Sequence, residues 1–357
     1  MAYTTINKPT DHVISDGYTG TSGNINVNIG FQPDLIWIKN KNNGYNHVLV
    51  DSVRGNTKVL EPSTSDAEGT CTEGVTAINS TGYTIGANTS SGGFEDDFNG
   101  TYNSPSYASW NWKGGTTSGI TTNGSTDTTP SSYSFNQTSG ISILKYAGSG
   151  STPTKIAHGL GVAPKLIIVK NLSGTADWVV GHQSMEWTKY IYLSSTAASV
   201  TAGGAAWENT APDTVNFTVG DNTQVNASGS DYIAYCFAEK TGYSKFRAYT
   251  HNGGSGDTGT FVNLGFKPSF LMIKNTSASS TDWIMYDSTR STINSVDDCL
   301  FPNEASAESV NYNMTFLSNG FKLNGSGPAM GSSGNVVIYA AFGQSLVGSN
   351  DVPCTGF

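Results

Sequence analysis

One eleven-residue pattern occurs three times along the chain, and this repetition constrains the fold more than any other feature. The copies read GFQPDLIWIKN at 30–40, GVAPKLIIVKN at 161–171 and GFKPSFLMIKN at 265–275. Each copy leads, through a similar series of short motifs, to an aromatic segment: YASWNWK at 107–113, YIAYCFAE at 232–239 and VVIYAAFG at 336–343. Because chance rarely preserves such spacing and order, the chain is predicted to contain three tandem copies of one unit.

The residues within each copy favour strands over helices. Short strand-like runs separated by Gly, Asn and Ser are typical of a β-sandwich or jelly roll. The apolar run that follows each proline is continuous, which predicts a strand covered on both faces. The closing segments place aromatic side chains on alternate positions, such as Trp110 and Trp112, which indicates a packed core wall. The sequence therefore predicts an all-β fold of three tandem β-sandwich or jelly-roll repeats. At the end of each repeated strand, the lysine is expected to reach water and the asparagine to form a turn.

The spacing of the copies predicts the domain boundaries. Repeat 1 is expected to span 1–113, repeat 2 to span 141–246, and repeat 3 to span 247–357 with a C-terminal tail. The intervening segment 114–140 is rich in Gly, Ser and Thr and carries one charge, Asp127, as flexible or extended linkers do. The sequence therefore predicts a mobile first repeat and a tight second–third pair.

Charge and composition exclude several classes of function. The formal net charge is −9 and no cluster of Lys and Arg occurs, so neither nucleic acid nor an anionic membrane surface is an expected partner. No apolar run is long enough to insert into a bilayer, and the first residues do not form a secretory signal. The four cysteines have no CxxC spacing, which favours reduced, mostly buried thiols and synthesis in a cytoplasm.

A DSxR motif occurs in two of the three copies. Asp51 and Arg54 form it in the first copy, Asp287 and Arg290 form it in the third, and the middle copy has Gly-His-Gln-Ser at 181–184. A carboxylate three residues from a guanidinium can form an ion pair that braces a loop. The same charged pairs are also candidate contacts for a ligand.

Two further groups of residues are candidates for binding. Aromatic rings near loops or strand ends can stack on sugar rings, and the candidates of this kind are Trp178, Trp187, Trp207 and Trp283. The densest acidic segment, FEDDFNG at 94–100, supplies Asp96, Asp97 and Asn99 as possible oxygen ligands for Ca²⁺, although a solvated loop is the simpler interpretation. No nucleophile–base set, GxSxG or HExxH motif occurs, so no catalytic residue is predicted and no cofactor other than Ca²⁺ is expected.

Several segments resemble a family of marine bacteriophage proteins, especially those of phages that infect cyanobacteria. The resemblance lies in MAYTTINKP at 1–9, the first repeated strand with its DSVRG motif, the junction DYIAYCFAE…GYSKF, and AAFGQSLVGSNDVPCT at 340–355. It implies a virion structural or tail-fibre-like protein with lectin-like sandwich domains. It brings no catalytic residues that could be transferred to this chain.

The expected function is therefore that of a non-enzymatic virion protein, made in the host cytoplasm. It would lie on a tail fibre or appendage that adheres to host-surface glycans, or it would decorate the capsid. Its expected partners are other virion proteins and further copies of itself, with a trimer as one possibility. A polysaccharide depolymerase is the alternative enzyme, and Glu95, Asp96 and Asp97 are its only obvious local carboxylates. A secreted adhesin is a third possibility.

Overall fold

The fold was analysed in a computed structural model, which describes residues 4, 6–89, 93–100, 105–325 and 327–345. Antiparallel sheets dominate these residues, and the all-β prediction is confirmed. The helical elements are short: the 3₁₀ turns η1 (Pro9–Asp11), η2 (Gln183–Met185) and η3 (Gly256–Thr258), and the helices α1 (Glu95–Asn99) and α2 (Thr223–Asn226). No helix in the described ranges is long and apolar enough to cross a membrane. The predicted C-terminal tail, residues 346–357, lies outside the described residues.

Three larger sheets share one core order of strands. In each, the strand with the Gly-x-x-Pro pattern lies between the aromatic closing strand and the strand that follows it in the sequence. The first sheet is β1 (Val13–Thr19), β9 (Ser106–Trp112), β3 (Leu35–Asn40) and β4 (Val48–Asp51). The second is β10 (Ser132–Asn136), β11 (Ile141–Ala147), β18 (Asp231–Phe237), β13 (Leu166–Asn171), β14 (Val179–His182), β15 (Lys189–Tyr192) and β16 (Val200–Thr201). The third is β19 (Ser244–Thr250), β25 (Val336–Ser345), β21 (Phe266–Asn275) and β22 (Trp283–Asp287).

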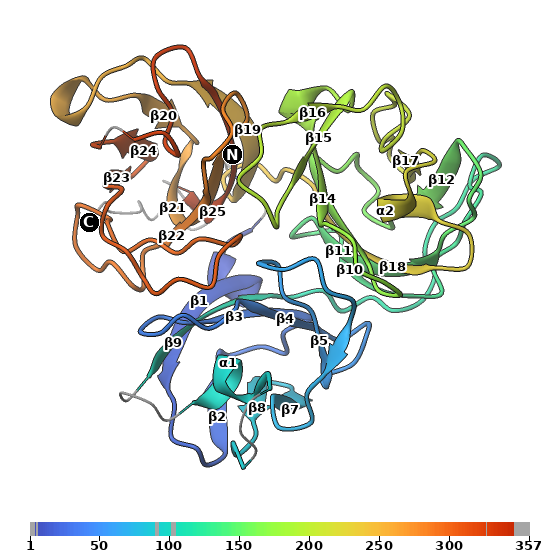
Figure 1. Ribbon diagram of the computed structural model, residues 1–357, viewed down its shortest axis with the longest axis horizontal. Helices are drawn as coiled ribbons and strands as arrows, with labels where there is room; N and C mark the ends of the chain where they lie inside the picture. Colours follow the sequence, from blue (N-terminus) through green and yellow to red (C-terminus); the bar gives the residue numbers. More distant parts are fainter. Residues whose placement is uncertain (1–3, 5, 90–92, 101–104, 326, 346–357) are drawn as a thin grey trace.

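A smaller sheet packs against each larger one. These smaller sheets are β2 (Ile25–Asn28), β8 (Gly82–Ile85) and β7 (Val75–Asn79); β12 (Thr154–Ala157) and β17 (Asn216–Val219); and β20 (Phe261–Asn263), β24 (Gly320–Leu323) and β23 (Met314–Leu317). A short pair of strands, β5 (Lys58–Val59) and β6 (Gly69–Thr70), lies beside β4 of the first larger sheet. Each larger sheet with its smaller partner encloses a separate buried apolar cluster. Elements β1–β9, β10–β18 and β19–β25 are here named lobes 1, 2 and 3, and Figure 1 shows them arranged around a common centre.

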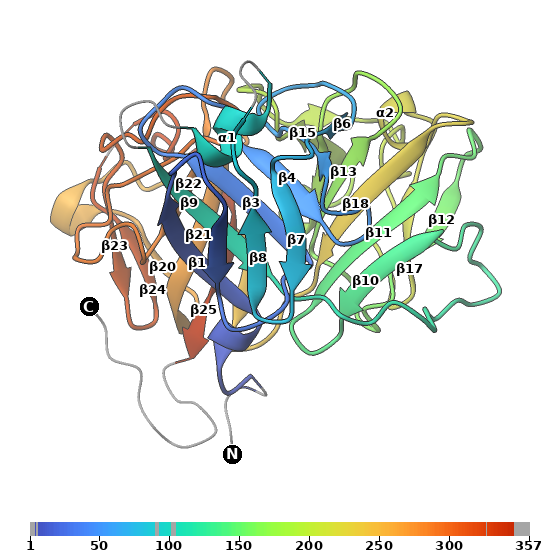
Figure 2. The ribbon, with the colours of Figure 1, turned by 90° about the horizontal axis from the view of Figure 1, so that it is seen from below.

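The larger sheets form the inner layer of this arrangement. Figure 2 shows β7 and β8 of lobe 1 in front of β3, β4 and β9, which lie nearer the other lobes. Alternate residues of a strand point to opposite faces, so Ile36 and Ile38 enter the cluster of lobe 1 whereas Leu35 and Trp37 enter a cluster shared by all three lobes. The prediction that this strand is covered on both faces is confirmed. Its second face is covered by the other two lobes.

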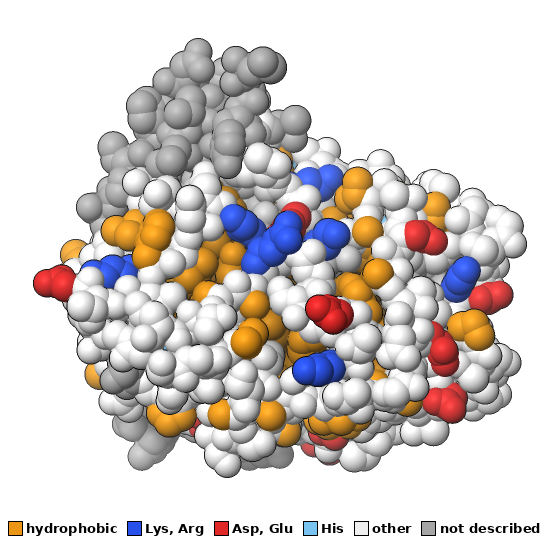
Figure 3. Space-filling view, turned by 90° about the horizontal axis from the view of Figure 1, so that it is seen from above, with side chains coloured by type: hydrophobic (Ala, Val, Ile, Leu, Met, Phe, Trp, Pro, Cys, Tyr) orange, Lys and Arg blue, Asp and Glu red, His pale blue; other side chains and the backbone are white. Residues whose placement is uncertain are grey.

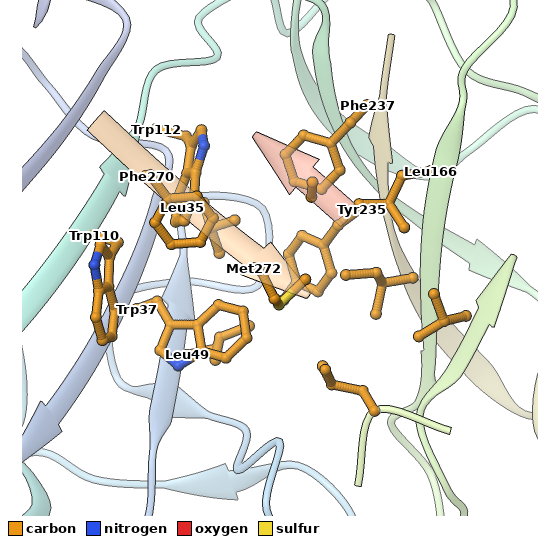
Figure 4. Close-up of a cluster of buried hydrophobic side chains, with 14 of the residues drawn as sticks. Leu35, Trp37, Leu49, Trp110, Trp112, Leu166, Tyr235, Phe237, Phe270 and Met272 are labelled. Carbon is orange, nitrogen blue, oxygen red and sulfur yellow. The ribbon is translucent and has the colours of Figure 1, made fainter. Parts of the chain in front are cut away.

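Three aromatic rings meet in the shared cluster, one from each closing strand. In each lobe the ring belongs to the residue that pairs with the start of the apolar run in the Gly-x-x-Pro strand. The three pairs are Trp112 with Leu35, Phe237 with Leu166, and Phe342 with Phe270. Their ring centroids are 6.4 Å, 6.0 Å and 5.9 Å apart for the pairs Trp112–Phe237, Trp112–Phe342 and Phe237–Phe342. Figure 4 shows Trp112 and Phe237 among the side chains of this cluster, which come from strands far apart in the sequence. One core therefore joins all three lobes.

The prediction of a mobile first repeat is wrong, because lobe 1 contributes three tryptophans to the shared core. The segment 114–140 is also not a free linker. It contains β10, which pairs with β11, and Thr116 forms a bridge with Phe135. Asp34 of lobe 1 accepts hydrogen bonds from the Gly114 backbone N–H (2.9 Å) and the Ser134 hydroxyl (2.7 Å). Backbone and hydroxyl hydrogen bonds, which a search for apolar runs overlooks, hold this polar segment in place.

Candidate functional site

Both DSxR motifs form buried ion pairs with the same geometry. Arg54 Nε lies 2.6 Å from Asp51 Oδ2, and Arg290 Nε lies 2.6 Å from Asp287 Oδ2. In each motif the other carboxylate oxygen accepts two backbone N–H bonds from the loop, and the guanidinium also reaches a glutamate, Glu68 or Glu308. The four side chains of the two pairs are at most 4% exposed. The interpretation as loop braces therefore fits, and the pairs offer no open surface to a ligand.

These ion pairs also connect neighbouring lobes. Asp51 Oδ2 accepts a hydrogen bond of 2.8 Å from the Tyr235 hydroxyl of lobe 2. Asp287 Oδ2 accepts one of 2.9 Å from the Trp110 indole N–H of lobe 1. Trp110 and Tyr235 occupy matching positions, because each pairs with the third residue of its β3 or β13 strand. The same contact thus joins lobe 3 to lobe 1 and lobe 1 to lobe 2.

The middle copy closes the cycle with a different residue. In lobe 3 the position that matches Trp110 and Tyr235 is Ala340, which has no side-chain donor. The neighbouring group available there is the Tyr339 carbonyl, and His182 Nε2 lies 3.3 Å from it. His182 Nδ1 accepts the Ser184 backbone N–H at 3.1 Å, so Nε2 carries the proton and donates. The middle copy therefore lacks the DSxR aspartate because lobe 3 presents a carbonyl acceptor to it, where lobes 1 and 2 present the side-chain donors Trp110 and Tyr235 to an aspartate.

Burial of His182 gives a testable pH dependence. Burial lowers the pKa of His182 to about 4, so between about pH 4 and 6.5 the unfolded chain binds this proton and the folded chain does not. The contribution of His182 to the free energy of unfolding is therefore fully present above pH 6.5 and is lost as the pH falls towards 4. At pH 5 the expected loss is at most about 2 kcal/mol relative to pH 7. Urea unfolding at both pH values should show a smaller loss for His182→Gln than for the original protein. Equal losses would contradict the assignment.

The lysines that end the repeated strands do not reach water, contrary to the sequence prediction. Lys39, Lys170 and Lys274 are fully buried, and their ammonium groups donate to backbone carbonyls. Lys170 Nζ reaches Ser65 O of lobe 1 at 3.1 Å, and Lys274 Nζ reaches Thr196 O of lobe 2 at 3.5 Å. Burial lowers the pKa of each of the three to about 8, which leaves them mostly charged at neutral pH. Lys170 and Lys274 therefore hold loops of neighbouring lobes together, whereas Lys39 donates within lobe 1.

The four tryptophans proposed as sugar platforms are buried, at most 5% exposed, and that prediction is wrong. Trp178 donates its indole N–H to Glu61 O of lobe 1 (3.1 Å), and Trp283 donates to Tyr192 O of lobe 2 (2.9 Å). Trp187 and Trp207 pack edge to face, 5.7 Å apart, against Gly181. Their places near strand ends suggested exposure, but those strand ends lie at the junctions between lobes or beneath loops.

The acidic segment forms helix α1, and its proposed calcium ligands do not converge. The Asn99 side chain is used by three backbone groups, and Asp96 accepts a bond of 2.8 Å from Asn88. Within the described residues no group of three or more His, Cys, Asp or Glu side chains is placed to hold a metal ion. The calcium site predicted from Asp96, Asp97 and Asn99 is therefore not formed by this arrangement.

Asp97 instead faces Glu61, a neighbour that sequence spacing did not suggest. Both line a hollow of about 310 Å³ with Tyr45 and Phe94. Burial and the Glu61 charge raise the pKa of Asp97 to about 8, and burial raises the pKa of Glu61. A carboxyl group that stays protonated beside a second carboxyl group can act as a general acid.

Two more hollows border the 114–140 segment and the junction of lobes 2 and 3. One of about 490 Å³ borders the start of the 114–140 segment and β10, and its lining carries no charge. The other, of about 470 Å³, lies between lobes 2 and 3 and is lined by Lys165, Lys245 and Glu239 among others. Figure 3 shows Lys and Arg side chains gathered near the middle of the face seen from above, on the side where lobes 2 and 3 lie. Sequence reasoning missed the hollow between lobes 2 and 3, because Lys165 and Lys245 come from separate segments.

Comparison with known proteins gives one match. Residues 8–345 match a family described as a domain of unknown function, DUF7483. No curated protein and no solved structure matches the chain. The matched range covers all three lobes and the segment between the first two. The chain therefore belongs to the DUF7483 family, and the family match spans the three-lobed body as one unit.

Proposed function

We propose that the chain consists of three tandem repeats of one β-sandwich unit, arranged as a closed ring within a single polypeptide. The shared strand order of the three larger sheets supports this, as does the cycle of contacts through Asp51, His182 and Asp287. A head-to-tail contact that repeats around a closed ring is the geometry of a cyclic oligomer. Here the contacts join parts of one chain.

The function that this body supports best is structural and adhesive. We propose a non-enzymatic virion protein of a bacteriophage, exposed on a tail fibre or appendage, which helps the particle adhere to host-surface glycans. The observation that carries the proposal is that the conspicuous charged and aromatic residues are used inside the body, between lobes. What remains for other molecules is a low-charge polar surface with a hollow at the junction of lobes 2 and 3. Decoration of the capsid is the variant that uses the same surface.

The proposed partners follow from the same arrangement. Other virion proteins would anchor the body, and further copies of the chain would assemble with it, a trimer included. Synthesis in the host cytoplasm fits the three described cysteines that are free and buried, Cys71, Cys236 and Cys299.

Purified particles test the location. We expect antibody-gold against this chain to label the tail, with the chain detected by mass spectrometry of the same particles. Label distributed over the shell would favour the capsid-decoration variant. Presence of the chain in infected cells together with its absence from purified particles would contradict the proposal.

A depolymerase is retained as a second candidate because of the Asp97–Glu61 pair. Two carboxyl groups, one of them kept protonated near neutral pH, are what glycosidic bond cleavage requires. Under this alternative, host polysaccharide incubated with the protein would release reducing ends, and Asp97→Asn would abolish the release. Release that persists unchanged in the variant would remove this pair from consideration.

A further inference from the structure

We propose that the hollow between lobes 2 and 3 binds an acidic sugar, a sugar ring that carries a carboxylate or a sulfate ester. The inference deepens the proposed glycan adhesion and rests on it. The hollow, of about 470 Å³, falls within the roughly 300–1,000 Å³ range of small-molecule sites. Its walls are the segment 162–165 just before β13, the turn from β18 to β19, and, from lobe 3, Leu264 and Phe266 at the start of β21.

The turn that forms one wall is held tightly in place. The Lys240 N–H donates to the Ser244 hydroxyl (3.0 Å), and the Ser244 N–H donates to Lys240 O (2.9 Å). Gly242, between them, has a φ of +73°, which favours glycine. Across the hollow, the Lys165 backbone N–H donates to Phe237 O at 2.7 Å. The site is therefore preorganised, which lowers the entropic cost of binding a ligand.

The charge of the hollow is positive although the whole chain is acidic. Glu239 is its only carboxylate, and Arg247 already holds that carboxylate through two bonds of 3.0 Å and 2.9 Å. Lys245 Nζ donates to Asn263 O at 2.9 Å, which holds its ammonium group beside the hollow. Within the described residues the Lys165 side chain makes no ion pair or hydrogen bond. Two ammonium groups without a carboxylate partner favour an anion.

The other lining groups suit a sugar better than a bare anion. Thr241 is exposed and brings a hydroxyl group, which donates and accepts hydrogen bonds as sugar hydroxyls do. Val162 is 40% exposed and offers an apolar surface to the C–H face of a ring. The uncharged hollow of similar size beside β10 lacks any lysine. The preference for an acidic ligand is therefore specific to the junction of lobes 2 and 3.

Calorimetric titration of the full chain tests this with four probes: a uronic-acid oligosaccharide, a sulfated oligosaccharide, a neutral oligosaccharide and inorganic sulfate. We expect one or both acidic oligosaccharides to bind, and the better binder to identify the charged group. In the double variant Lys165→Gln/Lys245→Gln the affinity should fall at least about tenfold. Lys189→Gln, which removes an exposed lysine elsewhere on lobe 2, should change it less than about twofold. Circular dichroism and the melting temperature confirm that each variant is folded.

The remaining outcomes separate this inference from the proposed function. A neutral oligosaccharide that binds the original and the double variant equally, with no binding of acidic ones, would overturn the acidic-sugar site and leave glycan adhesion intact. Inorganic sulfate that binds as tightly as the sulfated oligosaccharide would overturn the assignment to a sugar. Unchanged acidic-sugar affinity in the double variant would overturn the location. Failure of all oligosaccharides to bind would contradict glycan adhesion itself.

Discussion

Replacement of Trp112 by alanine is expected to lower the free energy of unfolding by about 3–5 kcal/mol, the usual cost of removing a large aromatic side chain from a core. Trp112 is 3% exposed and belongs to β9 of lobe 1. Its ring lies 5.5 Å from that of Phe270 and 6.0 Å from that of Phe342, both of lobe 3, and 6.4 Å from that of Phe237 of lobe 2. The cavity would therefore open at the junction of all three lobes.

Urea unfolding followed by circular dichroism measures this loss, with Phe261→Ala as the control. Phe261 is also a large apolar residue, but it is 48% exposed. Its replacement should therefore lower the free energy of unfolding by only about 0.5 kcal/mol, well under the loss expected for Trp112→Ala. A loss below about 1 kcal/mol for Trp112→Ala would mean that the lobes do not depend on the shared core.

The second large effect is expected from Asp51→Ala, at about 3–5 kcal/mol. The change leaves the Arg54 guanidinium buried with only Glu68 opposite it, and it leaves the Tyr235 hydroxyl of lobe 2 without its acceptor. Asp51 also accepts the backbone N–H groups of Val53 and Arg54, so the loop would lose its brace as well. An unpaired buried charge costs far more than an exposed ion pair contributes.

The chain supplies a matched control for that prediction. Lys8 and Asp11 form an ion pair with the same three-residue spacing, but their side chains are 71% and 52% exposed. Asp11→Ala should therefore cost no more than about 1 kcal/mol. A double-mutant cycle of Asp51→Ala with Tyr235→Phe should give a coupling energy of at least about 0.5 kcal/mol, because the two side chains share a hydrogen bond across lobes. Equal losses for Asp51→Ala and Asp11→Ala, or strict additivity in the cycle, would count against the cross-lobe contact.

The strands were predictable because their signal is local. The run from Leu35 to Ile38 is apolar at every position, and burial on both faces follows from that alone. What covers the face toward the centre of the molecule was not predictable, because the rings that contact Trp112 come from segments more than a hundred residues away. The polar composition of the 114–140 segment suggested mobility. Its hydrogen bonds to Asp34, however, depend on where the first lobe lies, which the composition does not reveal.

The candidate site was predicted less well, for a related reason. Exposure of Trp178 and Trp283 was inferred from their places near strand ends. In the fold a neighbouring lobe lies there, and its Glu61 or Tyr192 carbonyl accepts the indole N–H. One signal in the sequence pointed the right way. The lysine that ends each repeated strand is present in all three copies, which favours a shared structural role over three independent contacts with water. Asp97 and Glu61 are thirty-six positions apart, and only the fold brings them to one hollow.

Scanning calorimetry of the full chain tests the central claim, that the three lobes form one body around a shared core, most directly. Because each lobe lends side chains to the same apolar cluster, the lobes should unfold together. The account predicts a single transition whose calorimetric enthalpy equals its van't Hoff enthalpy. Two or three separate transitions, with lobe 1 melting independently of the others, would contradict it.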